Sequence, residues 1–268
     1  MKIFDFNIHL PDLKDDGVND RVATEIHATN QEMIERLDYV YDLKKVHGGN
    51  FMVFNSSLFM ENDEFAKYAR SQTDTAAFTL LIDFRAANVY EHIEAGIAAG
   101  INCIKFHSYH QQIDSSCYPK IIEICKYAEE KGLIICLDGS YGTSKMIQYD
   151  IVDFICTIAD AITKTTIIVL HSGGLQCLKI LLLALEKSNI YLETSLTLPW
   201  YEGSSIEQDL AFMYKKMEDH KILFATDSPY IPFQDGYDAT IRFFEKHGFS
   251  SEFQEGVFYH NAIQLLNS

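Results

Sequence analysis

The sequence contains no apolar run long enough to cross a membrane, and it is poor in basic residues. The most apolar stretch, residues 166–185, is interrupted by His171, Gly173, Gly174 and Lys179, so it predicts a buried strand, a turn and a helix. The chain carries 22 Lys and Arg against 38 Asp and Glu, a formal net charge of −16. This charge repels phosphate backbones and anionic lipid, which disfavours nucleic-acid binding and membrane-surface binding.

Cysteine pairs and linker segments are lacking as well. The six cysteines show no CxxC spacing, which disfavours a zinc cluster or a disulfide framework and predicts reduced thiols. No stretch rich in proline and glycine marks a domain boundary, so we expect one domain over residues 1–268. The opening residues, MKIFDF, lack the long apolar segment of a signal peptide, and we therefore expect a cytoplasmic protein.

The chain does contain a repeated alternation of strand and helix patterns. Short runs rich in β-branched and aromatic residues end in a polar residue, and a helical pattern follows each run. The predicted strands span residues 2–9, 51–55, 78–83, 101–107, 133–138, 166–171, 191–195 and 221–227. After the first, longer unit, the strand ends recur every 24 to 33 residues. This spacing predicts an α/β fold, the (β/α)8 TIM barrel.

Boundary signals support the helices between these strands. Thr29 and Glu32 form a capping-box pattern ahead of an apolar helical repeat. Asn88 predicts the start of a later helix and Gly100 its end, and Gly132 predicts the end of the next one. These signals place helices where a barrel requires them.

The alternation of residues along each strand predicts which side chains face the barrel interior, because side chains two residues apart share a face. In the first strand we expect Phe4 and Phe6 to meet the helices and His9 to face inward. In the sixth strand we expect Val169 on the same face as His171. Polar residues at the carboxyl ends of four strands are thereby directed at one volume at the barrel mouth: His9, Asp138, His171 and Asp227.

These four residues are of types that bind metal ions. A divalent cation lowers the pKa of bound water from about 15.7 to about 7 and polarises a carbonyl group. In this context five segments carry a resemblance: DFNIH, GINCIKFH, IIVLHSGG, ILFATDSPY and HNAIQLL. Together they resemble the amidohydrolase superfamily, in its amidohydrolase-related branch of TIM-barrel metal-dependent hydrolases and decarboxylases. The resemblance spans nearly the whole chain.

The resemblance implies roles for individual residues. The family pattern opens with Asp-x-His-x-His, in which both histidines bind metal; here His9 is the second, and Asn7 stands in place of the first. Strand five of the family supplies another histidine ligand, where this chain has Asp138. His171 and Asp227 match the pattern, which implies that Asp227 takes the proton of the attacking water. His171 would then polarise the substrate carbonyl or protonate the leaving group.

The two changed positions alter the expected metal site. Asn7 offers only a neutral carbonyl oxygen, and Asp138 replaces a nitrogen donor with an anionic oxygen. We therefore expect a divalent ion held by His9, Asp138, Asp227 and the adjacent Asn7. The harder ions Mn²⁺ and Mg²⁺ are favoured over Zn²⁺, and binding is weak or lost.

The expected function is metal-dependent hydrolysis of an amide, a lactone or a related carbonyl-derived bond in a small organic substrate. Two alternatives lie in the same branch, a decarboxylase and a metal-free lactone hydrolase. A third is a barrel that has lost catalysis and acts as a binding protein.

Three further residues are candidates for substrate contact. Lys105 and His107 lie two residues apart on the inward face of the fourth strand. Trp200, the only tryptophan, follows the seventh strand and is expected to form a wall over the substrate. Packing against a neighbouring chain is an equal alternative for Trp200, since the resemblance also implies a homodimer.

Overall fold

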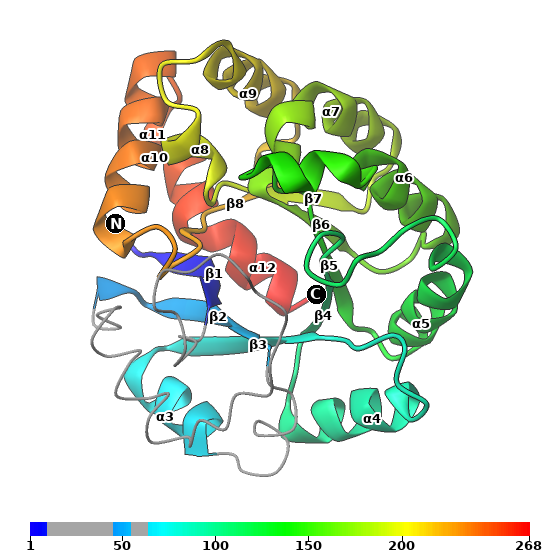
Figure 1. Cartoon of the computed structure of the whole chain (residues 1–268). Helices are drawn as coiled ribbons and strands as arrows, with labels where there is room; N and C mark the ends of the chain where they lie inside the picture. Colours follow the sequence, from blue (N-terminus) through cyan, green and yellow to red (C-terminus); the bar gives the residue numbers. More distant parts are fainter. Residues whose placement is uncertain (10–44, 55–63) are drawn as a thin grey trace.

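Residues 1–9, 45–54 and 64–268 are described in the computed structural model, and they form a ring of eight parallel strands surrounded by helices (Figure 1). The strands follow one another around the ring in the order of the sequence. They are β1 (Phe4–His9), β2 (Gly48–Val53), β3 (Thr75–Leu81), β4 (Cys103–Phe106), β5 (Ile134–Asp138), β6 (Ile167–Leu170), β7 (Ile190–Glu193) and β8 (Ile222–Leu223).

The ring closes between the last strand and the first. The Phe6 amide donates to the Phe224 carbonyl oxygen at 2.9 Å, and the Asp227 amide donates to the Asn7 carbonyl oxygen at 2.9 Å. A parallel bridge also joins Ile8 to Ser228. The predicted (β/α)8 TIM barrel is therefore confirmed.

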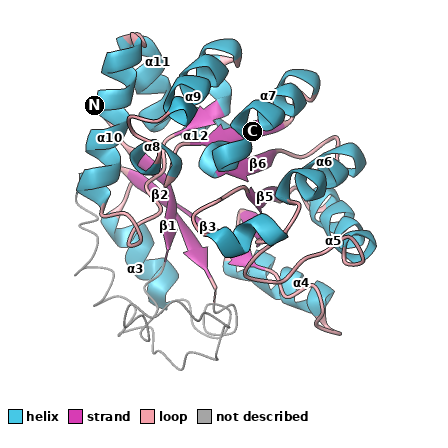
Figure 2. Cartoon of the chain, turned by 45° about the horizontal axis from the view of Figure 1, so that its top comes forward, coloured by secondary structure: helices cyan, strands magenta, loops and turns pink. Residues whose placement is uncertain are grey.

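Helices cover the outside of the barrel and one of its ends (Figure 1 and Figure 2). They are α3 (Glu64–Gln72), α4 (Val89–Ala99), α5 (Tyr118–Glu130), α6 (Ile151–Ala161), α7 (Cys177–Glu186), α8 (Thr197–Trp200), α9 (Ser205–Lys216), α10 (Phe233–His247), α11 (Ser251–Glu255) and α12 (Asn261–Leu266). None of these helices combines the length and the apolar content that a membrane crossing requires. All six cysteines are free thiols.

The helix ends follow the sequence signals closely. Asn88 is the N-cap of α4, and Gly100 ends this helix in the left-handed conformation with φ 91°. Gly132 also has a positive φ, 72°, directly after the C-cap of α5. The predicted capping box of Thr29 and Glu32 lies outside the described residues.

Two strands begin well before their predicted starts. β2 starts at Gly48 and β3 at Thr75, each three residues before the expected position. A side chain at residue 48 would collide with the ring of Phe4, so glycine allows the two strands to approach closely there. Glycine has a low β-propensity, which is why the pattern missed this start.

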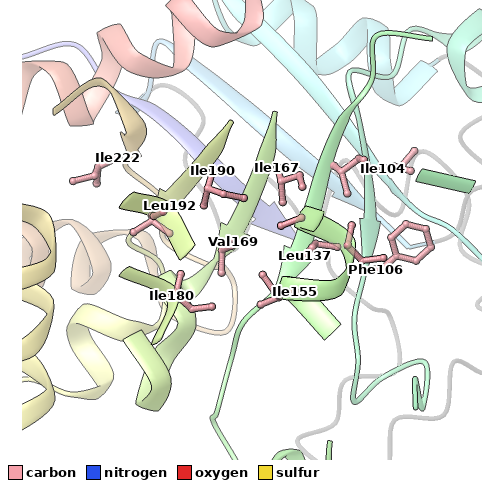
Figure 3. Packing of buried hydrophobic residues seen from close by; sticks show 14 of the residues in the cluster. Ile104, Phe106, Leu137, Ile155, Ile167, Val169, Ile180, Ile190, Leu192 and Ile222 are labelled. Atoms are coloured by element: carbon pink, nitrogen blue, oxygen red, sulfur yellow. The ribbon is translucent and has the colours of Figure 1, made fainter. Parts of the chain in front are cut away.

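The apolar core has two layers. The larger one lies between the strands and the helices, where Val169 packs with Ile155 of α6 and Ile180 of α7 (Figure 3). The smaller one fills the barrel interior with buried side chains of seven strands, Phe4 and Phe6 among them, and Tyr191 of β7 packs against it. α12 closes one end of the barrel (Figure 1), and its apolar residues join the interior layer.

The facing predictions for β1 and β6 were therefore wrong in part. Phe4 and Phe6 lie inside the barrel, because the pairing of β1 with β2 shifts register between Asp5 and Ile8 and breaks the simple alternation. Val169 packs against the helices, whereas the His171 side chain lies inside the barrel. His171 has a left-handed backbone, with φ 58°. This conformation turns the His171 side chain inward in spite of its place in the alternation.

Candidate active site

Buried polar side chains from six strand ends meet at the mouth of the barrel. We call this group the polar cluster: His9, Lys105, His107, Asp138, His171, Glu193 and Asp227. The carboxyl ends of parallel barrel strands all point to the same side, which is why residues distant in sequence converge there. Six of these seven side chains are almost completely buried, and His107 is partly exposed.

Asp138, at the end of β5, is the centre of the cluster. Its Oδ1 atom accepts hydrogen bonds from the Ser140 amide at 3.0 Å and the Ser140 hydroxyl at 2.6 Å. Its Oδ2 atom lies 3.3 Å from His171 Nε2, 3.5 Å from His107 Nε2 and 3.9 Å from Lys105 Nζ. Burial raises the pKa of Asp138, but His107, His171 and Lys105 outweigh burial and hold this pKa well below its ordinary value.

His171 lies between two carboxylates. Its Nε2 atom faces Asp138, and its Nδ1 atom lies 2.9 Å from Ser195 Oγ and 3.6 Å from Glu193 Oε1. The Glu193 carboxylate also accepts the His171 amide at 2.7 Å. Burial lowers the pKa of His171, but Asp138 and Glu193 outweigh it and raise this pKa to about 9. His171 is therefore an imidazolium at neutral pH, with both ring nitrogens as donors.

Asp227 and His9 form a hydrogen-bonded pair on another side of the cluster. His9 Nε2 lies 3.1 Å from Asp227 Oδ1, and the rings of Phe54 and Tyr230 pack edge-on against His9 with centroids 4.9 and 5.1 Å away. Burial lowers the pKa of His9, so this ring is neutral at pH 7. Burial raises the pKa of Asp227, but the hydrogen bond from His9 and the charge of His171 outweigh it and lower this pKa below its ordinary value.

Asn7 belongs to the same buried network. Its Nδ2 atom lies 3.2 Å from Ser195 Oγ and 3.5 Å from Glu193 Oε1. Its Oδ1 atom has no hydrogen-bond partner among the described residues. Lys105 is 1% exposed, with Nζ 5.3 Å from the ring centre of Phe54. A free acceptor and a buried ammonium group thus lie close to the proposed acid and base.

The cluster does not fit the divalent ion that the resemblance implies. The Nε2 atoms of His9, His107 and His171 each face a carboxylate oxygen at 3.1 to 3.5 Å. A carboxylate only accepts, so an Nε2 atom that donates to one, as in the pairs His9–Asp227 and His171–Asp138, has no lone pair left for a metal. Among the described residues, no group of three His, Cys, Asp or Glu side chains is placed to hold a metal ion. The charges that lie against the carboxylates of the cluster come instead from Lys105 and His171.

Comparison with known families agrees with the fold. The model of the amidohydrolase family matches residues 49–267. The chain belongs to the amidohydrolase family. A search of curated proteins finds no significant match to this chain.

Solved structures resemble the amidohydrolase over its full length. An uncharacterized TIM-barrel protein from Bordetella bronchiseptica has 16% identity and a TM-score of 0.68, covering 100% of this chain and 99% of the other. A "probable 2-pyrone-4,6-dicarboxylic acid hydrolase" from Acinetobacter baumannii, with citric acid bound, has 15% identity and a TM-score of 0.65, covering 100% of both chains. A dihydroxybenzoic acid decarboxylase from Polaromonas, with bound manganese and 2-nitroresorcinol, has 13% identity and a TM-score of 0.64, covering 99% and 97%. At these identities the likeness shows the fold.

Most candidate residues of the sequence come together in this amidohydrolase. His9, Asn7, Asp138, His171 and Asp227 lie in one hydrogen-bonded network, joined by Lys105 and His107. Trp200 differs, since it ends α8 and is 57% exposed.

Sequence reasoning gave no role to Glu193 or Ser195, although both end the seventh strand. The signal was present, because a carboxylate inside a buried strand needs a partner. In the structure that partner is His171, with Ser195 bonded to both residues.

Proposed function

We propose that this amidohydrolase hydrolyses a lactone, an amide or a related carbonyl-derived bond in a small organic substrate. The observation that supports the proposal is the opposed protonation of two buried side chains at the barrel mouth. The pKa of Asp227 is lowered, so its carboxylate is ionised and able to accept a proton. The pKa of His171 is raised to about 9, so its imidazolium is able to donate one. Two titratable side chains whose surroundings shift their pKa values in opposite directions can serve as the base and the acid of one site.

The reaction follows from these two roles. A water molecule beside Asp227 loses a proton to the carboxylate as its oxygen bonds to the substrate carbonyl carbon. The bond from that carbon to the leaving oxygen or nitrogen then breaks, and the leaving atom takes the proton of His171. The products are a carboxylic acid and an alcohol or amine, and the Asp227 proton passes to solvent as His171 is protonated again.

Neighbouring residues hold the acid and the base in place. Asp138 and Ser195 contact the two ring nitrogens of His171 and so hold the imidazole ring in place. His9 donates to Asp227 Oδ1 and leaves the other carboxylate oxygen for water. Lys105 and His107 are the proposed substrate contacts, and the Lys105 ammonium group would stabilise the negative charge that develops on the carbonyl oxygen.

A metal ion bound at such a site would acidify water and polarise the carbonyl. The pairing of His9 with Asp227 and of His171 with Asp138 does not favour that role. In the proposed reaction the proton transfers therefore belong to Asp227 and His171.

Decarboxylation is the second candidate. It needs a proton donor for the carbon atom that loses carbon dioxide, and a protonated His171 fits this need as well. The two reactions differ in their products, because only decarboxylation releases carbon dioxide.

The experiment is a substrate screen of the purified protein by pH-stat titration and carbon dioxide detection. The panel contains 2-pyrone-4,6-dicarboxylate, other lactones, small amides and dihydroxybenzoates. We expect acid release from at least one lactone or amide, and a loss of about 10³-fold in kcat for Asp227→Asn. Asp160→Asn, which changes an exposed aspartate, is the control that keeps full activity.

The outcomes separate the three hypotheses. Carbon dioxide release from a dihydroxybenzoate would favour the second candidate. Ligand binding without turnover of any compound would contradict both enzymes and favour a barrel that only binds. Full activity of Asp227→Asn would contradict the assignment of the base.

A further inference from the structure

One helix of the outer layer is apolar on both sides. The inner side of α7 packs into the core through Ile180, Leu183 and Ala184. The outer side exposes three more leucines, and a fourth lies just before the helix. We call these four the leucine face: Leu175 (41% exposed), Leu178 (41%), Leu182 (69%) and Leu185 (57%).

The leucine face differs from the rest of the described surface. The other exposed large apolar residues lie singly on separate segments: Met1, Ile147, Trp200, Phe212 and Tyr230. Scattered apolar residues need no partner, but a contiguous patch on one element marks an interaction surface. A helix that is apolar all round is one that is normally covered on both sides.

The spacing of the four leucines indicates what covers them. The three leucines on α7, Leu178, Leu182 and Leu185, have the d–a–d spacing of a helix that packs along another helix, and Leu175 extends the row just before α7. Leu182 is the central exposed member of this seam. The seam therefore fits a second helix with the same kind of leucine row.

The charges beside the leucine face indicate that the second helix is another copy of α7 and that it runs antiparallel. Lys179 and Glu186 are exposed and each follows a d-position leucine, so both occupy the e position beside the seam. When two copies of α7 run antiparallel about a two-fold axis near Leu182, Lys179 faces Glu186 of the partner subunit. The same pair forms twice by symmetry. In a parallel pair, Lys179 faces no acidic residue.

We propose that the leucine face is a homodimer interface in which α7 packs antiparallel against α7 of a second copy. The proposal does not depend on the proposed reaction, because no residue of the polar cluster lies on α7. In Figure 1, α7 lies in the outer ring between α6 and α9, where it is accessible to another chain.

The first test measures the oligomeric state of the full chain by sedimentation velocity at 0.15 M salt, where long-range repulsion from the net charge of −16 is screened. We expect a dimer for the wild-type chain and a monomer for Leu182→Glu. Ile147→Glu, which places the same charge at another exposed apolar position, stays a dimer. Circular dichroism checks that both variants are folded. A monomeric wild type, or a dimeric Leu182→Glu, would overturn the proposal.

The second test reverses the two charges. Lys179→Glu and Glu186→Lys should each raise the dimer Kd about tenfold, because each sets like charges opposite one another. The double variant K179E/E186K restores opposite charges and should return the Kd to the wild-type value. Lys126→Glu and Glu130→Lys, on the exposed side of α5, make the same changes in net charge elsewhere and should leave the Kd unchanged. A double variant no tighter than the single variants would exclude the antiparallel contact.

Discussion

The Nε2 atom of His171 lies 3.3 Å from the Oδ2 atom of Asp138, so the proposed acid is paired with the residue that replaces a histidine of the family pattern. The exchange of histidine for Asp138 adds a negative charge to the buried site. Lys105, His107 and His171 surround that charge, and the pKa of His171 rises to about 9 as a result. Asp138, at the altered ligand position, thus forms an ion pair with His171 that fits the role of His171 as a proton donor.

Metal content is the first prediction. Since the imidazole Nε2 atoms face carboxylates as donors, we expect protein purified without chelator to contain far less than one equivalent of zinc, manganese or iron by mass spectrometry of the elements. A chelator should leave the melting temperature and the turnover of any substrate unchanged. One tightly held equivalent of a divalent ion would contradict this account of the site.

The dependence of stability on pH is the second prediction. The folded pKa of His171, about 9, lies above its unfolded value of 6.5. The stability that protonated His171 contributes is therefore fully present below pH 6.5 and is lost as the pH rises through about 9. This loss amounts to roughly 3 kcal/mol of unfolding free energy.

The matching variant is His171→Asn, since asparagine tolerates the left-handed backbone at this position. The gap in unfolding free energy between wild type and variant should narrow from pH 6.5 to pH 9, as measured by urea denaturation. A gap that stays constant over this range would show that His171 is not protonated in the folded protein.

Glu193 is the subject of the third prediction, as a positioning residue for His171. Its carboxylate accepts the His171 amide and the Ser195 hydroxyl, and its charge helps to raise the pKa of His171. Glu193→Gln should move the alkaline limb of the kcat profile to lower pH, with a smaller effect on KM. Glu130→Gln, on the surface, should leave the profile in place. A variant that loses activity equally at every pH would point to a structural role alone.

The sequence was sufficient to predict the barrel fold and to place part of the polar cluster in its interior. Asp138 follows the simple alternation of β5, and Asp227 lies in the interior as predicted although its own φ is 65°, so both were placed correctly. His171 reaches the same volume although Val169 faces the helices, because its own φ is 58°, the first of a run of positive values that continues at Ser172 and Gly173 with 49° and 78°. Backbone turns of this kind cannot be read from alternation.

The register shift in β1 is a second feature that local pattern does not encode. It places Phe6 inside the barrel although the alternation assigns it to the outer face. The partnership of Glu193 with His171 is a third, since it joins residues 22 positions apart through a fold that must form first.

The central claim is that His171 is a buried imidazolium, and an NMR titration of histidine-labelled protein tests it most directly. The His171 signals, assigned by their loss in His171→Asn, should titrate with a midpoint near pH 9, and Asp138→Asn should lower that midpoint. A His171 midpoint at or below 6.5 in the wild-type protein would contradict the acid–base account.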